Sequence, residues 1–138
     1  MNSAPITVLV IEAHPMMREA LCSAIADEAD LKVGMQADNV MQALQMAMIV
    51  IPDIILLALG NPDQGDMDGL IALRQSLPAA PILALTSNEV PGQEQAALEN
   101  GAQTVLTKAA PRAELLQVLR ELRTKAFKYH SESTLKRR

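Results

Sequence analysis

The sequence has almost no aromatic residues. It contains no Trp, one Phe and one Tyr, and both aromatics, Phe127 and Tyr129, lie near the C-terminal end. Nevertheless, 49% of its 138 residues are apolar, which is enough for a sizeable core in a single domain. We therefore expect a core built from aliphatic side chains.

Cysteine and long apolar runs are scarce as well. The single cysteine, Cys22, excludes an internal disulfide, and its Ala/Leu-rich helical surroundings predict a buried, unreactive thiol. No run of about 18 apolar residues occurs, so no membrane-spanning helix is expected. The first residues, MNSAPITVLVIEA, lack the basic segment of a secretory signal, which predicts a cytoplasmic protein.

Charge is distributed unevenly along the chain. From Arg123 onward there are six basic residues and one acid, Glu132, which gives +5 and leaves −9 for the preceding residues within the overall net charge of −4. This asymmetry predicts an acidic domain over residues 1–125 and a basic tail or linker over residues 126–138. Such a tail could contact nucleic-acid phosphates or lead into another domain.

Short apolar runs alternate with segments of helical periodicity. The first run, ITVLVI, shows no polar alternation, so both of its faces are expected to be buried, as in a parallel sheet covered by helices on both sides. The predicted strands are 6–11, 31–35, 53–59, 81–86 and 104–107. The predicted helices are 15–27, 39–48, about 70–77, 91–100 and one that begins at Pro111.

Parallel sheets of this kind place their functional sites at the carboxyl ends of the strands. The residues found there are Glu12, Ala13 and His14, then 58–61, then Thr86 and Ser87, and finally Lys108.

These segments resemble, in order and spacing, the receiver domain of bacterial response regulators over about residues 5–125. The resemblance rests on VLVIEAHPMMREAL, PDIILLAL followed by MDGL, PILALTS, and GAQTVLTKAAP. His14-Pro15 is typical of receivers that precede a LuxR-type helix-turn-helix domain. The resemblance implies an α/β fold of three layers, with a doubly wound, flavodoxin-like parallel sheet of five strands in the order 2-1-3-4-5.

The resemblance also assigns positions in the family's phosphorylation site. It places the phosphoacceptor at Ala58, the acidic pair at Glu12 and Ala13, the switch threonine at Thr86 and the family's lysine at Lys108. In the family, an acid of the pair, the phosphoacceptor and a backbone carbonyl hold a magnesium ion. That carbonyl would belong to Gly60, and the family's reporter aromatic is replaced by Val105.

Two alanines therefore stand where the family has carboxylates. One carboxylate and one carbonyl do not make an octahedral oxygen site for a hard cation, and the methyl group of Ala58 has no oxygen to attack a phosphoryl group. We expect no metal, no cofactor and no enzymatic activity. The leading hypothesis is a degenerate pseudo-receiver that acts as an interaction or dimerisation module in signal transduction and transcription regulation.

The surviving polar residues allow more than one interpretation. Lys108 either pairs with Glu12 or is solvated, and Thr86 either caps a turn or keeps a switch role. His14 is expected to form the turn before Pro15 rather than to bind a metal. The loop after the third predicted strand carries about three extra residues near QGD (64–66), and QGDMDG (64–69) only partly matches a calcium loop.

Partner surfaces are expected on the fourth and fifth helices or on the first and fifth. The fifth helix carries Arg112, Arg120 and Arg123, whereas the fourth-helix region, with Glu89, Glu94 and Glu99, is acidic. A homodimer or a different partner protein is plausible there. Nucleic acid would bind only through a separate domain, and no membrane contact is expected.

Two rival functions remain open from the sequence. A loop aspartate, Asp63, Asp66 or Asp68, could accept a phosphoryl group and give weak autophosphatase activity. Alternatively, the emptied pocket could sense a small molecule.

Overall fold

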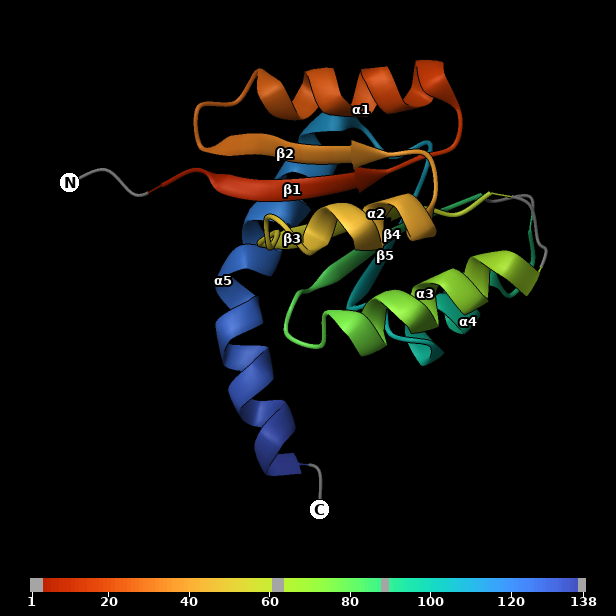
Figure 1. Cartoon of the computed structure of the whole chain (residues 1–138), viewed down its shortest axis with the longest axis vertical. Helices are drawn as coiled ribbons and strands as arrows, with labels where there is room; N and C mark the ends of the chain where they lie inside the picture. The colour runs from red at the N-terminus through yellow and green to blue at the C-terminus, as the bar shows by residue number, and fades with distance from the viewer. Residues whose placement is uncertain (1–3, 61–63, 88–89, 137–138) are drawn as a thin grey trace.

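The computed structural model describes residues 4–60, 64–87 and 90–136, without the side chains of 64–66 and 125–136. Its five parallel strands form one sheet in the order β2-β1-β3-β4-β5, which confirms the predicted fold (Figure 1). The strands are β1 (Ile6–Ile11), β2 (Leu31–Ala37), β3 (Ile54–Ala58), β4 (Ile82–Thr86) and β5 (Thr104–Thr107). The helices are α1 (Pro15–Ala26), α2 (Val40–Ala47), α3 (Gln64–Ser76), α4 (Gln93–Glu99) and α5 (Arg112–Lys136).

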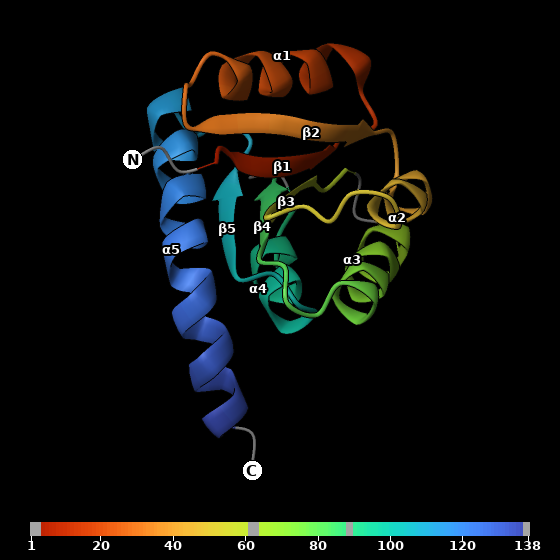
Figure 2. The same ribbon diagram turned by 60° about the vertical axis from the view of Figure 1, so that its left-hand side comes forward.

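Both faces of the sheet are buried beneath helices. Figure 2 shows α1 and α5 on one side and α2, α3 and α4 on the other. Alternate strand residues point to opposite layers: Leu9 and Leu57 pack with α2 to α4, whereas Val8 and Leu56 pack with α1 and α5. Among the side chains that the structure describes, the buried hydrophobic ones are all aliphatic, as the composition predicted.

Two helix boundaries differ substantially from the sequence prediction. Helix α3 begins at Gln64, so the residues predicted as a loop insertion, 64–66, lie in its first turn. Helix α5 runs to Lys136 through the predicted tail, and Figures 1 and 2 show it extending past the sheet. Neither Pro nor Gly occurs after Pro111, so nothing in this polar segment breaks the helix.

Smaller differences concern a strand and a thiol. Strand β2 continues to Ala37 and contains a bulge, because Val8 pairs with Val33 but Leu9 pairs with Met35. Cys22 is half-buried rather than fully buried, and burial raises the pKa of its thiol above the usual value. Within the described residues, no helix is both long and apolar enough to cross a bilayer.

The edge of the sheet opposite the strand carboxyl ends is held by Arg74. Its guanidinium donates to the carbonyl of Gly101 at 2.9 Å, to that of Ala80 at 2.9 Å and to the side-chain oxygen of Gln103 at 2.6 Å. Gly101 has a φ of +126°, and a Cβ added there would lie 3.1 Å from Cβ of Arg74. The position therefore requires glycine for two reasons, its backbone conformation and its close contact with Arg74.

A second glycine with positive φ lacks the close contact. Gly92 has a φ of +79°, and a Cβ there would meet nothing within 4 Å. We expect Gly101→Ala to lower the free energy of unfolding by roughly 2–3 kcal/mol and Gly92→Ala by only about 1 kcal/mol, because Gly101 combines a less favourable φ with the contact to Arg74. Urea denaturation measures both variants, and an equal loss would contradict the expectation that Gly101 is the more constrained position.

Candidate functional site

The buried polar side chains of the described residues gather at one edge of the sheet. Glu12, Thr86 and Gln93 are each no more than 5% exposed. Glu12 follows β1, Thr86 ends β4, and Gln93 opens α4 after β4. This is the carboxyl edge, where the sequence predicted the site.

The carboxylate of Glu12 is fixed by the start of α1. Its Oε2 accepts a hydrogen bond from the backbone N–H of His14 at 2.8 Å. His14 is extended, with φ −84° and ψ 117°, and Pro15 opens the helix. This geometry agrees with the predicted turn at His14. The main chain of Glu12 is held too, because its carbonyl accepts from Nη1 of Arg18 at 2.7 Å.

Lys108 faces the other carboxylate oxygen. Its Nζ lies 4.0 Å from Oε1 of Glu12, so the predicted ion pair is present, at the outer limit for such a contact. Oε1 itself is buried and accepts no hydrogen bond from the described residues. The Glu12 side chain is 7% exposed and that of Lys108 28%. A buried carboxylate thus depends on one partly exposed cation for its charge compensation.

The pair of Glu12 and Lys108 has two alanines as neighbours, Ala13 along the chain and Ala58 in the sheet. Ala58 is the last residue of β3, is half-buried and pairs with Leu85 of β4, whereas Ala13 is exposed after Glu12. Neither side chain offers an atom that could bind a metal or a phosphoryl group. Across the described part of the chain, no three His, Cys, Asp or Glu side chains are placed to hold a metal ion.

Thr86 is oriented toward the neighbouring strand. Its Oγ1 lies 3.5 Å from the carbonyl oxygen of Leu106 in β5, a long hydrogen bond, and its own carbonyl accepts from the backbone N–H of Lys108 at 2.8 Å. The residue therefore neither caps a helix nor forms a turn. It links β4 to the end of β5 and helps to place Lys108.

Gln93 was missed by the sequence analysis. Its Oε1 accepts from the backbone N–H of Ser87 at 2.9 Å, and its Nε2 lies 3.4 Å from the carbonyl oxygen of Gly60. One side chain thus joins the connections that follow β3 and β4. The available signal was its spacing of four residues from Ala97, which places both on the buried face of α4.

Of the three aspartates proposed as substitute phosphoacceptors, the structure describes the side chain of one. Asp63 and the side chain of Asp66 lie outside the described residues, and Asp68 is exposed on α3. The segment 64–69 is helical, so its backbone does not form the calcium loop that it partly matched.

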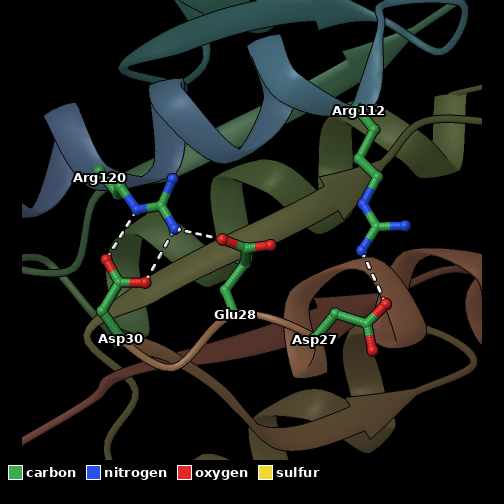
Figure 3. Close-up of polar contacts among 5 residues, drawn as sticks. All are labelled: Asp27, Glu28, Asp30, Arg112 and Arg120. Carbon is green, nitrogen blue, oxygen red and sulfur yellow. Dashed lines mark hydrogen bonds and ion pairs between the residues drawn. The ribbon is translucent and has the colours of Figure 1, made fainter.

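The arginines of α5 are engaged within the chain (Figure 3). Nε and Nη2 of Arg120 bind the two carboxylate oxygens of Asp30 at 2.7 and 2.8 Å, and Nη2 also lies 2.7 Å from Oε1 of Glu28. Arg112 binds Asp27 at 2.8 Å. The third, Arg123, lies 2.6 Å from Oδ1 of Asp53 at the start of β3.

These contacts revise the expected partner surface. The sequence suggested that the basic residues of α5 could complement the acidic α4 of another molecule. In the structure, all three arginines instead pair with acids of the loop after α1 or of the segment before β3. Their charge is already compensated, so an interface that used them would exchange existing ion pairs for new ones.

The pair of Arg120 with Asp30 predicts an acid-dependent contribution to stability. Hydrogen bonds from Arg120 hold the pKa of Asp30 below its usual value. The contribution is therefore present above the ordinary pKa of an aspartate and is lost as the pH falls through the folded-state value. Asp30→Asn should lower the urea midpoint at neutral pH and have little effect in strong acid. Asp68→Asn, which removes an exposed carboxylate, is the control, and a pH-independent effect of Asp30→Asn would contradict the prediction.

The pair of Lys108 with Glu12 predicts a larger cost for losing one partner than for losing a surface lysine. Lys108→Met leaves the buried carboxylate without a cation and should lower the free energy of unfolding by about 1–2 kcal/mol. The matched control is Lys32→Met, at an exposed position on β2, for which we expect a change below about 0.5 kcal/mol. Chemical denaturation distinguishes them, and equal values would mean that the 4.0 Å contact contributes nothing.

Known proteins share both the sequence pattern and the fold. The response regulator receiver domain family matches residues 8–120. The nitrate/nitrite response regulator protein NarL of Escherichia coli K12 is 30% identical over 120 residues, which are 87% of this chain and 56% of that protein. Response regulator GacA of Pseudomonas viridiflava is 31% identical over 115 residues, or 83% and 54%. The chain therefore spans about half the length of the curated relatives that it matches.

Solved structures agree. A LuxR-family two-component response regulator from Aurantimonas sp. superimposes with a TM-score of 0.78 at 26% identity, covering 88% of this chain and 86% of that one. The response regulator domain of Thermotoga maritima CheB gives 0.76 at 25%, covering 87% and 97%. With this agreement in sequence and in sheet order, the chain belongs to the response regulator receiver domain family.

Proposed function

We propose that this receiver domain acts without aspartyl phosphate, as a non-enzymatic protein-interaction module in two-component signalling and transcription regulation. One observation carries the proposal: the side chain at the end of β3, at Ala58, is a methyl group rather than a carboxylate. A methyl group offers no nucleophile for phosphoryl transfer.

The neighbouring donors support the same proposal because they do not fit magnesium. Magnesium requires near-octahedral oxygen ligands at about 2.0–2.1 Å. Ala13 contributes no side-chain oxygen, and Glu12 binds the N–H of His14 through one oxygen and faces Lys108 with the other. The carbonyl of Gly60 already has the amide of Gln93 within 3.4 Å. A phosphoryl group would lack the cation that neutralises its charge during transfer.

A receiver that takes no phosphoryl group still has surfaces for partners. We propose that it forms a homodimer or binds a partner protein through α4 and α5 or through α1 and α5. Leu98, 46% exposed on α4, offers an apolar contact one helical turn after the exposed Glu94 and Gln95. We further propose that nucleic acid is bound only through a separate domain and that the protein is cytoplasmic.

A phosphodonor experiment tests the proposal. Incubation with acetyl phosphate and magnesium should leave the mass of the intact protein unchanged, and magnesium should leave its thermal midpoint unchanged. The double variant Ala13→Asp/Ala58→Asp restores the missing carboxylates and is the positive control. We expect it to gain the mass of one phosphoryl group and to be stabilised by magnesium, because ligand binding to the folded state alone raises stability.

Phosphorylation of the unaltered chain would overturn the proposal. If a phosphate-sized increment appeared and was lost on replacing Asp63, Asp66 or Asp68 by Asn, the domain would use a substitute loop acceptor. Binding of magnesium to the unaltered protein would contradict the misfit of its donors.

A further inference from the structure

Gln93 has an unusual position for an uncharged polar side chain. It is 4% exposed and stands at the first turn of α4, directly after Gly92, whose φ is +79°. Ala97, four residues later on the same face, is completely buried. The amide of Gln93 is therefore directed into the carboxyl edge of the sheet rather than into solvent.

The two ends of this amide reach different connections. Oε1 accepts from the backbone N–H of Ser87, immediately after β4, and Nε2 points to the carbonyl of Gly60, two residues after β3. The bond to Ser87, at 2.9 Å, has ordinary hydrogen-bond geometry, whereas the 3.4 Å contact to Gly60 is long. Glutamine can make both contacts because its amide both donates and accepts.

The contact between Gln93 and Gly60 is of interest because of the carbonyl group that it involves. By resemblance to the family, this carbonyl is the backbone ligand of the metal. In this chain it faces an amide N–H instead of a cation. By that resemblance, the carbonyl of Gly60 is a ligand position that the alanines at 13 and 58 leave unaltered, and the amide of Gln93 contacts it.

We propose that Gln93 is a positioning residue that ties the connection after β3 to the connection after β4 and, through the carbonyl of Gly60, takes over a position that a metal ion occupies in phosphorylated receivers. The proposal rests on the proposed function, since a phosphorylation-independent domain needs another means of fixing these connections. This link, formed by the contacts of the Gln93 amide with Ser87 and Gly60 and called the tie below, carries no charge, so it requires neither metal nor phosphate to form.

Hydrogen exchange of the Ser87 amide tests the tie directly. Gln93→Met keeps the length of the side chain but neither donates nor accepts, so we expect the Ser87 N–H to exchange about tenfold faster. Gln93→Glu keeps an acceptor for Ser87 but loses the donor to Gly60, so exchange at Ser87 should change less than about twofold. Gln95→Met is the matched control, because Gln95 is exposed on the same helix and, within the described part of the chain, its amide binds only the side chain of Glu99.

The carbonyl ¹³C shift of Gly60 reports the other end of the tie. It should move in both Gln93→Met and Gln93→Glu and stay in place in Gln95→Met. Global stability is measured in parallel, so that a general loosening is distinguished from a local one. An unchanged exchange rate at Ser87 in Gln93→Met, or an unmoved Gly60 shift in both Gln93 variants, would overturn the proposal.

Magnesium affinity tests whether the amide of Gln93 competes with a metal ion for the carbonyl of Gly60. In the Ala13→Asp/Ala58→Asp background, adding Gln93→Met removes the amide contact to the carbonyl of Gly60 and should tighten magnesium binding, measured by calorimetry, about threefold to tenfold. Adding Gln95→Met should leave it unchanged. Equal affinities with and without Gln93 would show that the amide does not compete for that carbonyl.

These measurements separate the inference from the proposed function. If the unaltered protein were phosphorylated but the Ser87 amide still depended on Gln93, the tie would stand and the phosphorylation-independent role would fall. If the protein took no phosphate and exchange of the Ser87 amide did not depend on Gln93, the phosphorylation-independent role would stand and the positioning role of Gln93 would fall.

Discussion

When helices cover both faces of a sheet, buried polar side chains can be accommodated only at the ends of the strands. Among the described residues, the buried apolar side chains are aliphatic, and the buried polar residues, Glu12, Thr86 and Gln93, all lie at the carboxyl edge. An unpaired polar group in an apolar interior costs several kcal/mol. The hydrogen bond from His14 to Glu12, the approach of Lys108 to the same carboxylate and the hydrogen bond from Ser87 to Gln93 reduce this cost.

The same edge shows how a charged site becomes a neutral one without a change of fold. Carboxylates crowded at one point repel each other by a few kcal/mol at an effective dielectric of about 20, and a cation normally relieves that repulsion. With alanine at 13 and 58, one buried carboxylate remains, and one lysine matches it. The amide of Gln93 then holds the adjoining connections by hydrogen bonds alone. In our proposal, protein atoms alone therefore hold these connections in place.

The strand order could be anticipated from the resemblance to receiver domains, whereas the aliphatic core follows from the composition and the pair of Glu12 with Lys108 from the convergence of parallel strand ends. Gln93 was overlooked because its neighbours Glu94 and Gln95 are polar and exposed, so α4 looks like a surface segment. The length of α5 was misjudged from its polar composition, although it contains no helix breaker. The partners of Arg112 and Arg120 lie 85 to 92 residues away along the chain, a distance over which charge pattern alone does not identify contacts.

Helix α5 has a mechanical consequence. Its first half is anchored, since Arg112 and Arg120 bind the loop after α1 and Arg123 binds Asp53. The 13 residues after Arg123, 124–136, add about 20 Å of continuous helix beyond these anchors. Such a helix acts as a lever arm: a tilt of about 5° at the anchored half displaces its far end by nearly 2 Å, so small rearrangements of the ion pairs are amplified along its length.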